Sequence, residues 1–261
     1  MNGLLMRFLG HSTVRMELAG RVVLTDPVLT HSVGGLTRVA APLPRETWAG
    51  VDLVLISHLH GDHLHLPSLR KLGRDVPVVV PRGAGDWLRR RGFSAVREIG
   101  LGETVTEAGL KVTAVPAKHS GHRWGPRFTH GPQAPAIGHL VEAGGVRVYN
   151  SGDTDLFDDM AGFGPLDVAL LPVWGWGPNL GPGHLDPERA AEAVRLLRPK
   201  VTVPVHWGTL AVPGIARTRR MRELLVTPPR RFAAAAAGET EVLVTEPGDR
   251  VALREGTEVG E

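Results

Sequence analysis

The sequence predicts an α/β fold, for two reasons. Short apolar runs rich in Val, Leu and Ile recur along the chain and are typical of buried strands; residues 51–56 and 76–80 are examples. Helical segments at residues 66–72 and 84–91 alternate with such runs, which is the order of elements in an α/β protein. A chain of 261 residues, 42% of them hydrophobic, can bury a sizeable core. We therefore expect a single domain over residues 1–261, or one compact pair of similar halves within it.

Each expected element has a local signal. Ala19 and Gly20 are small turn residues that predict a hairpin, Pro67 occupies the first turn of a helix, and Gly92 ends the next helix. We expect strands at residues 4–9, 13–18, 21–25, 51–56, 76–80, 95–99, 103–107, 110–115, 136–142, 145–150, 166–172, 200–205, 241–245 and 250–254. We expect helices at residues 66–72, 84–91, 189–197, 217–225 and 229–237.

Three segments with several glycines and prolines are expected to lack regular structure. Residues 31–49 indicate a surface loop. Residues 123–135 indicate an ordered loop or lid, and residues 174–183, with two Trp and four Gly, a further loop.

The charge balance argues against a dedicated nucleic-acid-binding protein. Lys and Arg total 30 against 27 Asp and Glu, which gives a net charge of only +3. The basic runs at residues 89–91 and 217–222 have helical spacing and favour solvated helix faces over phosphate binding. Residues 1–9 lack the features of a signal peptide, and no apolar run approaches the roughly 20 residues that cross a bilayer. We expect a soluble, cytoplasmic protein with no transmembrane segment and no nucleic-acid partner.

Metal binding is the chemistry that the sequence predicts most strongly. The chain has no cysteine, so any metal must be held by histidine and carboxylate. Residues 57–65, Ser-His-Leu-His-Gly-Asp-His-Leu-His, directly follow an expected strand and carry several groups that bind metal or transfer protons, with Ser57 and His65 at their ends. A polar loop with several surface histidines is the simpler alternative.

The spacing within this loop suits two ions. His58 and His60 alternate, so on extended backbone both side chains leave one face and can bind one ion. Gly61 permits a tight turn, after which Asp62 and His63 face another direction and suit a second ion a few ångströms away.

Other expected strands also end in residues that can bind metal. His119 is expected to be the third ligand of the first ion, with His122 as the alternative. Asp153 follows a strand and a flexible Ser-Gly pair, which suits a bridging carboxylate, although an Asx turn would also explain it. His206 ends the last central strand and completes a second site with the Asp-His pair of the loop.

Three further polar residues are candidates for the same site. His184 lies before Asp186, a good N-cap for the helix at residues 189–197, and is either a functional or an idle loop residue. Asp26 ends an expected strand; it either caps a turn or accepts a hydrogen bond from a ligand histidine. His11 is similarly ambiguous.

The pattern His-x-His-x-Asp-His after a hydrophobic strand resembles the signature of the metallo-β-lactamase superfamily. Further motifs occur in the order found in the branch that includes the N-acyl-phosphatidylethanolamine-hydrolysing phospholipases D and the L-ascorbate-6-phosphate lactonases. These motifs are Gly10-His11-Ser12-Thr13, Thr25-Asp26-Pro27, Ala117-Lys118-His119, Ser151-Gly152-Asp153-Thr154, Gly183-His184-Leu185-Asp186-Pro187 and Val205-His206-Trp207-Gly208-Thr209.

This resemblance implies a four-layer αββα sandwich, the metallo-β-lactamase fold, with a binuclear site at the edge between two β-sheets. Similar phospholipases have a histidine at the position of His184 that contacts the phosphate and is needed for turnover. The implied metal ligands are His58, His60 and His119 for one ion, Asp62, His63 and His206 for the other, and Asp153 as the bridge between them.

The expected activity is hydrolysis by a hydroxide that two divalent ions share. Asp62 and His184 are the expected catalytic residues: Asp62 orients the nucleophile, and His184 protonates the leaving group, with a metal-bound water as the alternative donor. Zinc is the first expectation for the metal, and the same ligands accept manganese or iron.

Phosphodiester hydrolysis is the expected reaction, on a small-molecule or lipid-like substrate, because both phospholipase-like motifs, Gly-His-x-x-Pro and His-Trp-Gly-Thr, occur. A lactonase acting on a phosphorylated sugar acid is the alternative. A non-catalytic metal-binding domain is the alternative of another class, and its mark would be a missing ligand, whereas all seven are present.

Overall fold

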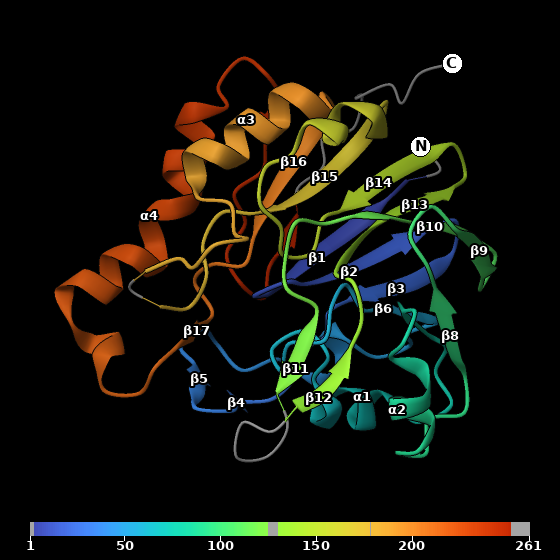
Figure 1. Ribbon diagram of the computed structural model, residues 1–261. Coiled ribbons are helices and arrows are strands. Elements are labelled where there is room, and N and C mark those ends of the chain that lie inside the picture. Colours follow the sequence, from blue (N-terminus) through green and yellow to red (C-terminus); the bar gives the residue numbers. More distant parts are fainter. Residues whose placement is uncertain (1–2, 125–129, 178, 252–261) are drawn as a thin grey trace.

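The computed structural model describes residues 3–124, 130–177 and 179–251. Two mixed β-sheets lie at the centre, and helices cover their outer faces (Figure 1). Helices α1 (Leu66–Leu72) and α2 (Gly85–Arg89) lie on the first sheet, and α3 (Pro187–Leu197) and α4 (Arg219–Ala235) lie on the second. The expected four-layer αββα arrangement is confirmed.

The first sheet has seven strands and changes from antiparallel to parallel pairing along its width. In spatial order its strands are β19 (Arg250–Val251), β1 (Leu5–Gly10), β2 (Thr13–Leu18), β3 (Arg21–Thr25), β6 (Leu53–Leu55), β7 (Val78–Pro81) and β8 (Val96–Ile99). Because β3 and β6 are parallel, their carboxyl ends meet at one edge, and the residues that follow them lie close together.

The second sheet has the same number of strands and also combines both kinds of pairing. In spatial order its strands are β18 (Glu241–Val242), β16 (Pro199–Val205), β15 (Leu166–Pro172), β14 (Val146–Asn150), β13 (Ile137–Ala143), β10 (Leu110–Pro116) and β9 (Thr104–Glu107). Strands β14, β15 and β16 are parallel neighbours, so the segments after them also emerge at one edge.

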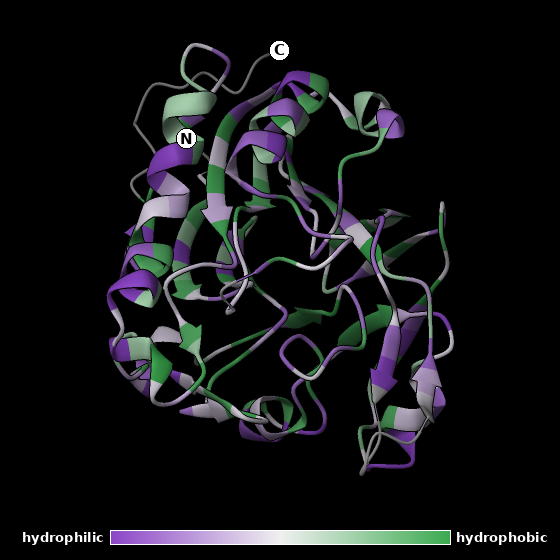
Figure 2. Ribbon diagram, turned by 60° about the vertical axis from the view of Figure 1, so that its left-hand side comes forward, coloured by the Kyte–Doolittle hydropathy of each residue, from purple (hydrophilic) through white to green (hydrophobic). Residues whose placement is uncertain are grey.

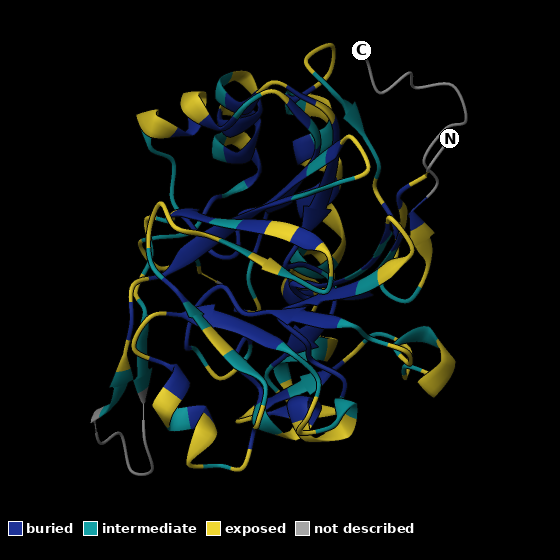
Figure 3. Ribbon diagram, turned by 90° about the vertical axis from the view of Figure 1, so that its right-hand side faces the viewer, coloured by how far each residue is buried: buried dark blue, intermediate teal, exposed yellow. Residues whose placement is uncertain are grey.

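The main hydrophobic core lies between the two sheets. Phe8 and Met16 of the first sheet belong to the same buried cluster as Val112 and Val148 of the second. The strands are therefore largely buried, whereas the helices expose one side (Figure 3). In Figure 2 the helices carry both hydrophilic and hydrophobic residues, as expected for helices with one exposed and one buried side. No helix within the described residues is long and apolar enough to cross a membrane.

Two of the segments expected to be loops contain short elements. In residues 31–49 the structure has β4 (Ser32–Val33), β5 (Leu36–Arg38) and the 3-10 turn η1 (Arg45–Thr47). In residues 123–135 it has most of the hairpin β11 (His122–Trp124) and β12 (His130–Gln133), while residues 125–129 lie outside the described residues. Strand β5 pairs with its sequence neighbour β4 on one side and with β17 (Leu210–Ala211), which is distant in the chain, on the other.

The C-terminal third also differs from expectation. The helices expected at residues 217–225 and 229–237 form the single helix α4, with Pro228 and Pro229 inside it. Both prolines are buried, so tertiary packing holds the helix across a point where local propensity predicts a break. The strand expected at residues 241–245 is only two residues long, and residues 252–254 of the last expected strand lie outside the described residues. Within the described residues there are two further 3-10 turns, η3 (Asp158–Phe163) and η4 (Ile215–Arg217).

Candidate metal centre

The segments that follow the parallel strands of both sheets bring histidine and aspartate side chains together at one edge of the sandwich. These side chains form four overlapping groups in which the ligand atoms lie within 4.8 Å of one another. The groups are His11, Asp62, His63 and His206; His58, His60 and His119; His58, His63 and Asp153; and His119, Asp153 and His184. All eight site residues that the sequence predicted are in these groups, and His11 joins them.

The group of His58, His60 and His119 is a triangle of imidazole nitrogens. Nε2 of His58 lies 3.0 Å from Nδ1 of His60, and Nε2 of His119 lies 3.1 Å from the same atom. The outer nitrogens of two rings are already engaged: Nδ1 of His119 donates to the carbonyl of Gly183 at 2.7 Å, and Nδ1 of His58 lies 3.0 Å from Oγ of Ser57.

This triangle cannot be held by hydrogen bonds alone. Because His58 and His119 donate outward through Nδ1, their Nε2 atoms carry lone pairs, and Nδ1 of His60 has at most one proton to offer them. Lone pairs facing one another at this distance call for a cation between them. Nitrogens bound 2.0–2.1 Å from a tetrahedral zinc ion lie about 3.3–3.4 Å apart, close to the spacing observed.

Burial favours the neutral, metal-binding form of these rings. It lowers the pKa of His58 well below its ordinary value, and neighbouring His63 lowers it further. It also lowers the pKa of His60 to about 4, again with a contribution from a neighbouring ring, that of His119. Neutral imidazole is the form that binds a metal ion, so these two rings are ready to bind one at neutral pH.

The carboxylate of Asp153 lies among the rings of His58, His63 and His206. Its Oδ2 lies 3.3 Å from Nε2 of His63, 3.2 Å from Nε2 of His206 and 4.0 Å from Nε2 of His58. Nδ1 of His206 donates to the carbonyl of Trp174 at 2.7 Å, so its Nε2 also carries a lone pair. Nε2 of His63, Nε2 of His206 and Oδ1 of Asp153 are buried without a hydrogen-bond partner among the described residues. Such orphaned donor atoms fit a divalent cation.

The buried carboxylate of Asp26 forms hydrogen bonds with Ser57 and His63. Its Oδ1 accepts from the backbone N–H of Ser57 at 2.8 Å, and its Oδ2 accepts from Oγ of Ser57 at 2.6 Å and from Nδ1 of His63 at 3.0 Å. Since the Ser57 hydroxyl donates its hydrogen bond to Asp26, its oxygen accepts a hydrogen bond from Nδ1–H of His58. One buried carboxylate thus orients His63 directly and His58 through Ser57, the kind of support that ligand histidines commonly have.

His11 is the residue whose role the sequence left open, and the structure places it against Asp62. Its Nε2 lies 3.1 Å from Oδ2 of Asp62. Its backbone is left-handed, with φ of 55°, and is fixed by hydrogen bonds with Thr209 and with the backbone N–H of His206. Burial by itself raises the pKa of Asp62, but the hydrogen bond from His11 and the nearby histidines hold it well below its usual range.

His184 approaches Asp153 from the loop before α3. Its Nε2 lies 3.5 Å from Oδ2 of Asp153, its Nδ1 donates to the carbonyl of Gly181 at 3.2 Å, and 22% of its side chain is exposed. Although burial lowers the pKa of His184, the contact with Asp153 raises it above its ordinary value on balance. A half-buried histidine that holds a proton on Nε2 can donate that proton to a reacting group.

Two histidines that the sequence considered lie apart from these groups. His65 is the N-cap residue of α1, and its Nδ1 lies 2.8 Å from Oγ of Ser68. His122 lies on β11, where its ring pairs with the amide of Gln133. His119, rather than His122, therefore lies beside His58 and His60.

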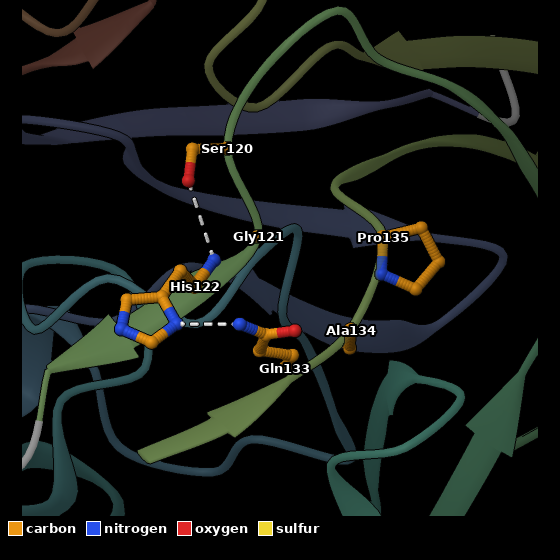
Figure 4. Close-up of a pocket in the computed structure, with 6 residues that line it drawn as sticks. All are labelled: Ser120, Gly121, His122, Gln133, Ala134 and Pro135. Carbon is orange, nitrogen blue, oxygen red and sulfur yellow. Dashed lines mark hydrogen bonds between the residues drawn. The ribbon is translucent and has the colours of Figure 1, made fainter. Parts of the chain in front are cut away.

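A cavity of about 450 Å³ begins one residue after His119. In Figure 4 the imidazole of His122 and the amide of Gln133 face each other, with the hydroxyl of Ser120 near the backbone N–H of His122. The lining residues are Ser120, Gly121, His122, Gln133, Ala134 and Pro135. None of these six is a carboxylate, lysine or arginine, and the cavity offers the Ser120 hydroxyl, the His122 imidazole and the Gln133 amide as hydrogen-bonding groups.

Comparison with known proteins identifies the family. Residues 21–207 match the family model described as a β-lactamase superfamily domain. A UPF0173 metal-dependent hydrolase of Thermococcus onnurineus is 33% identical over 257 residues, covering 95% of this chain and 98% of the relative. The chain belongs to the UPF0173 metal-dependent hydrolase family of the metallo-β-lactamase superfamily. Another UPF0173 metal-dependent hydrolase, from Thermus thermophilus, is 37% identical over 223 residues, 83% of this chain and 91% of the relative.

Solved structures agree with this assignment. The UPF0173 chain superposes on Igni18, described as a metallo hydrolase from the archaeon Ignicoccus hospitalis, with a TM-score of 0.72 and 26% sequence identity. The superposition covers 97% of this chain and 99% of Igni18. The two proteins therefore share the whole arrangement of sheets and helices.

Proposed function

We propose that this UPF0173 chain is a binuclear metal-dependent hydrolase. The observation that carries the proposal is the set of imidazole nitrogens that face one another with at most one proton to share, beside the buried, unpartnered Nε2 atoms of His63 and His206. The proposed ligands are His58, His60 and His119 for one divalent cation, Asp62, His63 and His206 for the other, and Asp153 between the two.

The chain's own residues divide the remaining work. Two divalent cations bound here would lower the pKa of a water molecule and neutralise the charge that develops on the substrate. Asp62, held by His11, accepts a hydrogen bond from the attacking water and so orients it. His184 delivers the proton on its Nε2 to the leaving group.

Zinc is the metal that the ligand set favours, because imidazole and carboxylate in a site of three or four ligands suit it. Manganese and iron accept the same donors and are the alternatives. The absence of cysteine from the whole chain excludes thiolate ligands, which would have favoured softer metals.

For the substrate we propose a phosphodiester carried by a small or lipid-like molecule. Support comes from the Gly183-His184 and His206-Trp207 motifs, which resemble those of phospholipases D, and from the exposed edge of His184 beside Asp153. The cavity that begins at Ser120, one residue after His119, has no carboxylate, lysine or arginine in its lining and suits a polar organic group attached to the reacting centre. A lactonase acting on a phosphorylated sugar acid is the second candidate, since the same metal-held nucleophile attacks a carbonyl carbon.

The first test combines metal content with turnover. Elemental analysis of the purified protein is expected to give about two metal ions per chain. Hydrolysis of bis(p-nitrophenyl) phosphate is expected to stop after chelation and to return on addition of zinc or manganese.

The outcomes separate the candidates. Two ions without phosphodiester turnover would favour the lactonase, which a panel of lactones would then test. No metal after reconstitution would contradict the binuclear proposal itself.

A further inference from the structure

Arg123 reaches from β11 to the metal loop, which we define as residues 59–64. Its Nη1 atom donates to the carbonyl of Leu59 at 2.9 Å and to the carbonyl of Leu64 at 2.9 Å. One guanidinium nitrogen therefore uses both of its hydrogens on the two ends of one loop.

The bracketed loop carries three of the proposed ligands: His60, Asp62 and His63. Inside it, the carbonyl of His60 accepts from the backbone N–H groups of His63 and Leu64, at 3.1 and 2.9 Å. These two bonds close the turn but do not fix its outer carbonyls. Arg123 supplies that fixation from another element, 59 residues away in sequence from Leu64.

The guanidinium is itself held in place by Trp87 of α2. The central carbon of the Arg123 guanidinium lies 4.7 Å from the centroid of the Trp87 ring, and that of Arg91 lies 3.7 Å from it. Arg91 donates to the backbone of Trp87 and not to the metal loop. Burial, together with Arg91, lowers the pKa of Arg123 to about 10, so the side chain still carries its charge at neutral pH.

We propose that Arg123 is a positioning residue that holds the metal loop in its ligand-presenting conformation. This inference rests on the proposed metal centre. Arg123 follows His122, which lines the cavity, on the same strand β11.

The test uses three variants and zinc as the probe. Arg123→Met keeps an apolar stem against Trp87 and removes both N–H donors, so zinc affinity is expected to fall about 10–100-fold. Arg91→Met is the matched control, because it removes the other arginine on the same tryptophan, and its affinity is expected to stay within about twofold of wild type. Arg123→Lys retains charge and N–H donors and is expected to lie between wild type and Arg123→Met.

A readout without metal separates positioning from metal chemistry. In the metal-free protein, amide hydrogen exchange in residues 59–64 is expected to be faster in Arg123→Met than in wild type or Arg91→Met. Wild-type exchange and wild-type zinc affinity in Arg123→Met would overturn the inference, and so would an equal loss in Arg91→Met. If Arg123→Met does not fold, Arg123→Lys decides: exchange and affinity identical to wild type would overturn the inference, and an intermediate loss of both would support it.

Failure of the proposed function has a different outcome. A wild-type protein that binds neither zinc, manganese nor iron would contradict the metal centre. A wild-type protein that binds zinc while Arg123→Met binds it equally well would contradict only the role of Arg123.

Discussion

Nε2 of His11 lies 3.1 Å from Oδ2 of Asp62, although the two residues are 51 positions apart in the sequence. His11 comes from the turn between β1 and β2, whereas Asp62 lies in the metal loop after β6. The contact therefore joins a segment that precedes the parallel strands β3 and β6 to a segment that follows them. Because burial lowers the pKa of His11 to about 4, its ring is neutral at pH 7, and its Nε2–H donates a hydrogen bond to Asp62.

Replacing His11 tests whether this contact orients the carboxylate. His11→Asn tolerates the left-handed backbone but is too short to reach Asp62. Zinc affinity and kcat/KM are expected to fall about 10–100-fold, as for other residues that orient ligands. Chelator competition and steady-state kinetics measure both. His31→Asn, on an exposed histidine, is the control; wild-type affinity in His11→Asn would show that Asp62 needs no support from His11.

Asp153 is expected to be indispensable because it lies between both groups of histidines. Asp153→Ala removes the carboxylate that approaches His63 and His206 and is expected to abolish turnover and reduce bound metal from about two ions to one or fewer. His60→Ala is expected to abolish turnover as well. Circular dichroism should show both variants folded, and Asp159→Ala, on an exposed turn, should behave as wild type. Full turnover in metal-washed Asp153→Ala or His60→Ala would refute the assignment.

The sequence predicted which residues meet at this edge because each proposed ligand follows a local signal. His58, His60, Asp153 and His206 all follow recognisable apolar strands, and parallel strands bring their carboxyl ends to one edge. The fold class followed from the same alternation of strands and helices. A resemblance to a known superfamily then supplied the four-layer arrangement.

What the sequence could not supply are contacts that depend on tertiary packing. The side chain of Arg123 binds carbonyls of the metal loop, and the sequence carries no sign of a bond to a backbone group so far away. The pairing of β5 with β17 likewise joins segments that are far apart in the sequence. Helix α4 continues through Pro228 and Pro229 because both are buried, which local propensity cannot register.

His139 is expected to make the protein sensitive to acid. It is fully buried on β13, both ring nitrogens lack a hydrogen-bond partner among the described residues, and burial lowers its pKa from 6.5 to about 4. The unfolded chain therefore binds more protons than the folded one between these values. The free energy of unfolding is highest above pH 6.5 and decreases as the pH falls towards 4, with about 3 kcal/mol attributable to this group.

The contribution of His139 can be isolated by difference. Urea unfolding of metal-free wild type and His139→Leu between pH 7 and 4 should show a smaller loss of stability in the variant. The other histidines titrate alike in both proteins, so they cancel. An identical pH dependence in the two proteins would show that His139 is not the titrating group.

Gly152 is expected to be the glycine whose replacement most disturbs the site. A Cβ atom there would lie 2.4 Å from Cβ of Ser57, and the backbone has φ of +59°. Left-handed strain and overpacking together predict that Gly152→Ala lowers the free energy of unfolding by about 2–4 kcal/mol. Gly145→Ala is the matched control, because its φ is +79° with no atom within 4 Å of the added carbon, and should cost only about 1–2 kcal/mol. Equal losses would mean that Ser57 moves aside freely.

Asp26→Asn is the sharpest test of how the metal ligands are oriented, because it changes charge and donor pattern without changing shape. In either orientation the amide places an NH₂ group against groups that now donate to Asp26: the backbone N–H of Ser57, or Nδ1 of His63. In the second orientation His63 must become the tautomer that carries its proton on Nε2. A protonated Nε2 has no lone pair with which to bind a metal ion. Zinc affinity should fall about 10–100-fold with little change in secondary structure, and nitrogen-15 imidazole shifts should report the tautomer of His63. Asp52→Asn, on a half-buried carboxylate that accepts from the backbone of Val22 at the opposite end of the same strand pair, should leave zinc affinity unchanged. If Asp26→Asn retained both wild-type affinity and the wild-type His63 tautomer, Asp26 would be a turn residue only.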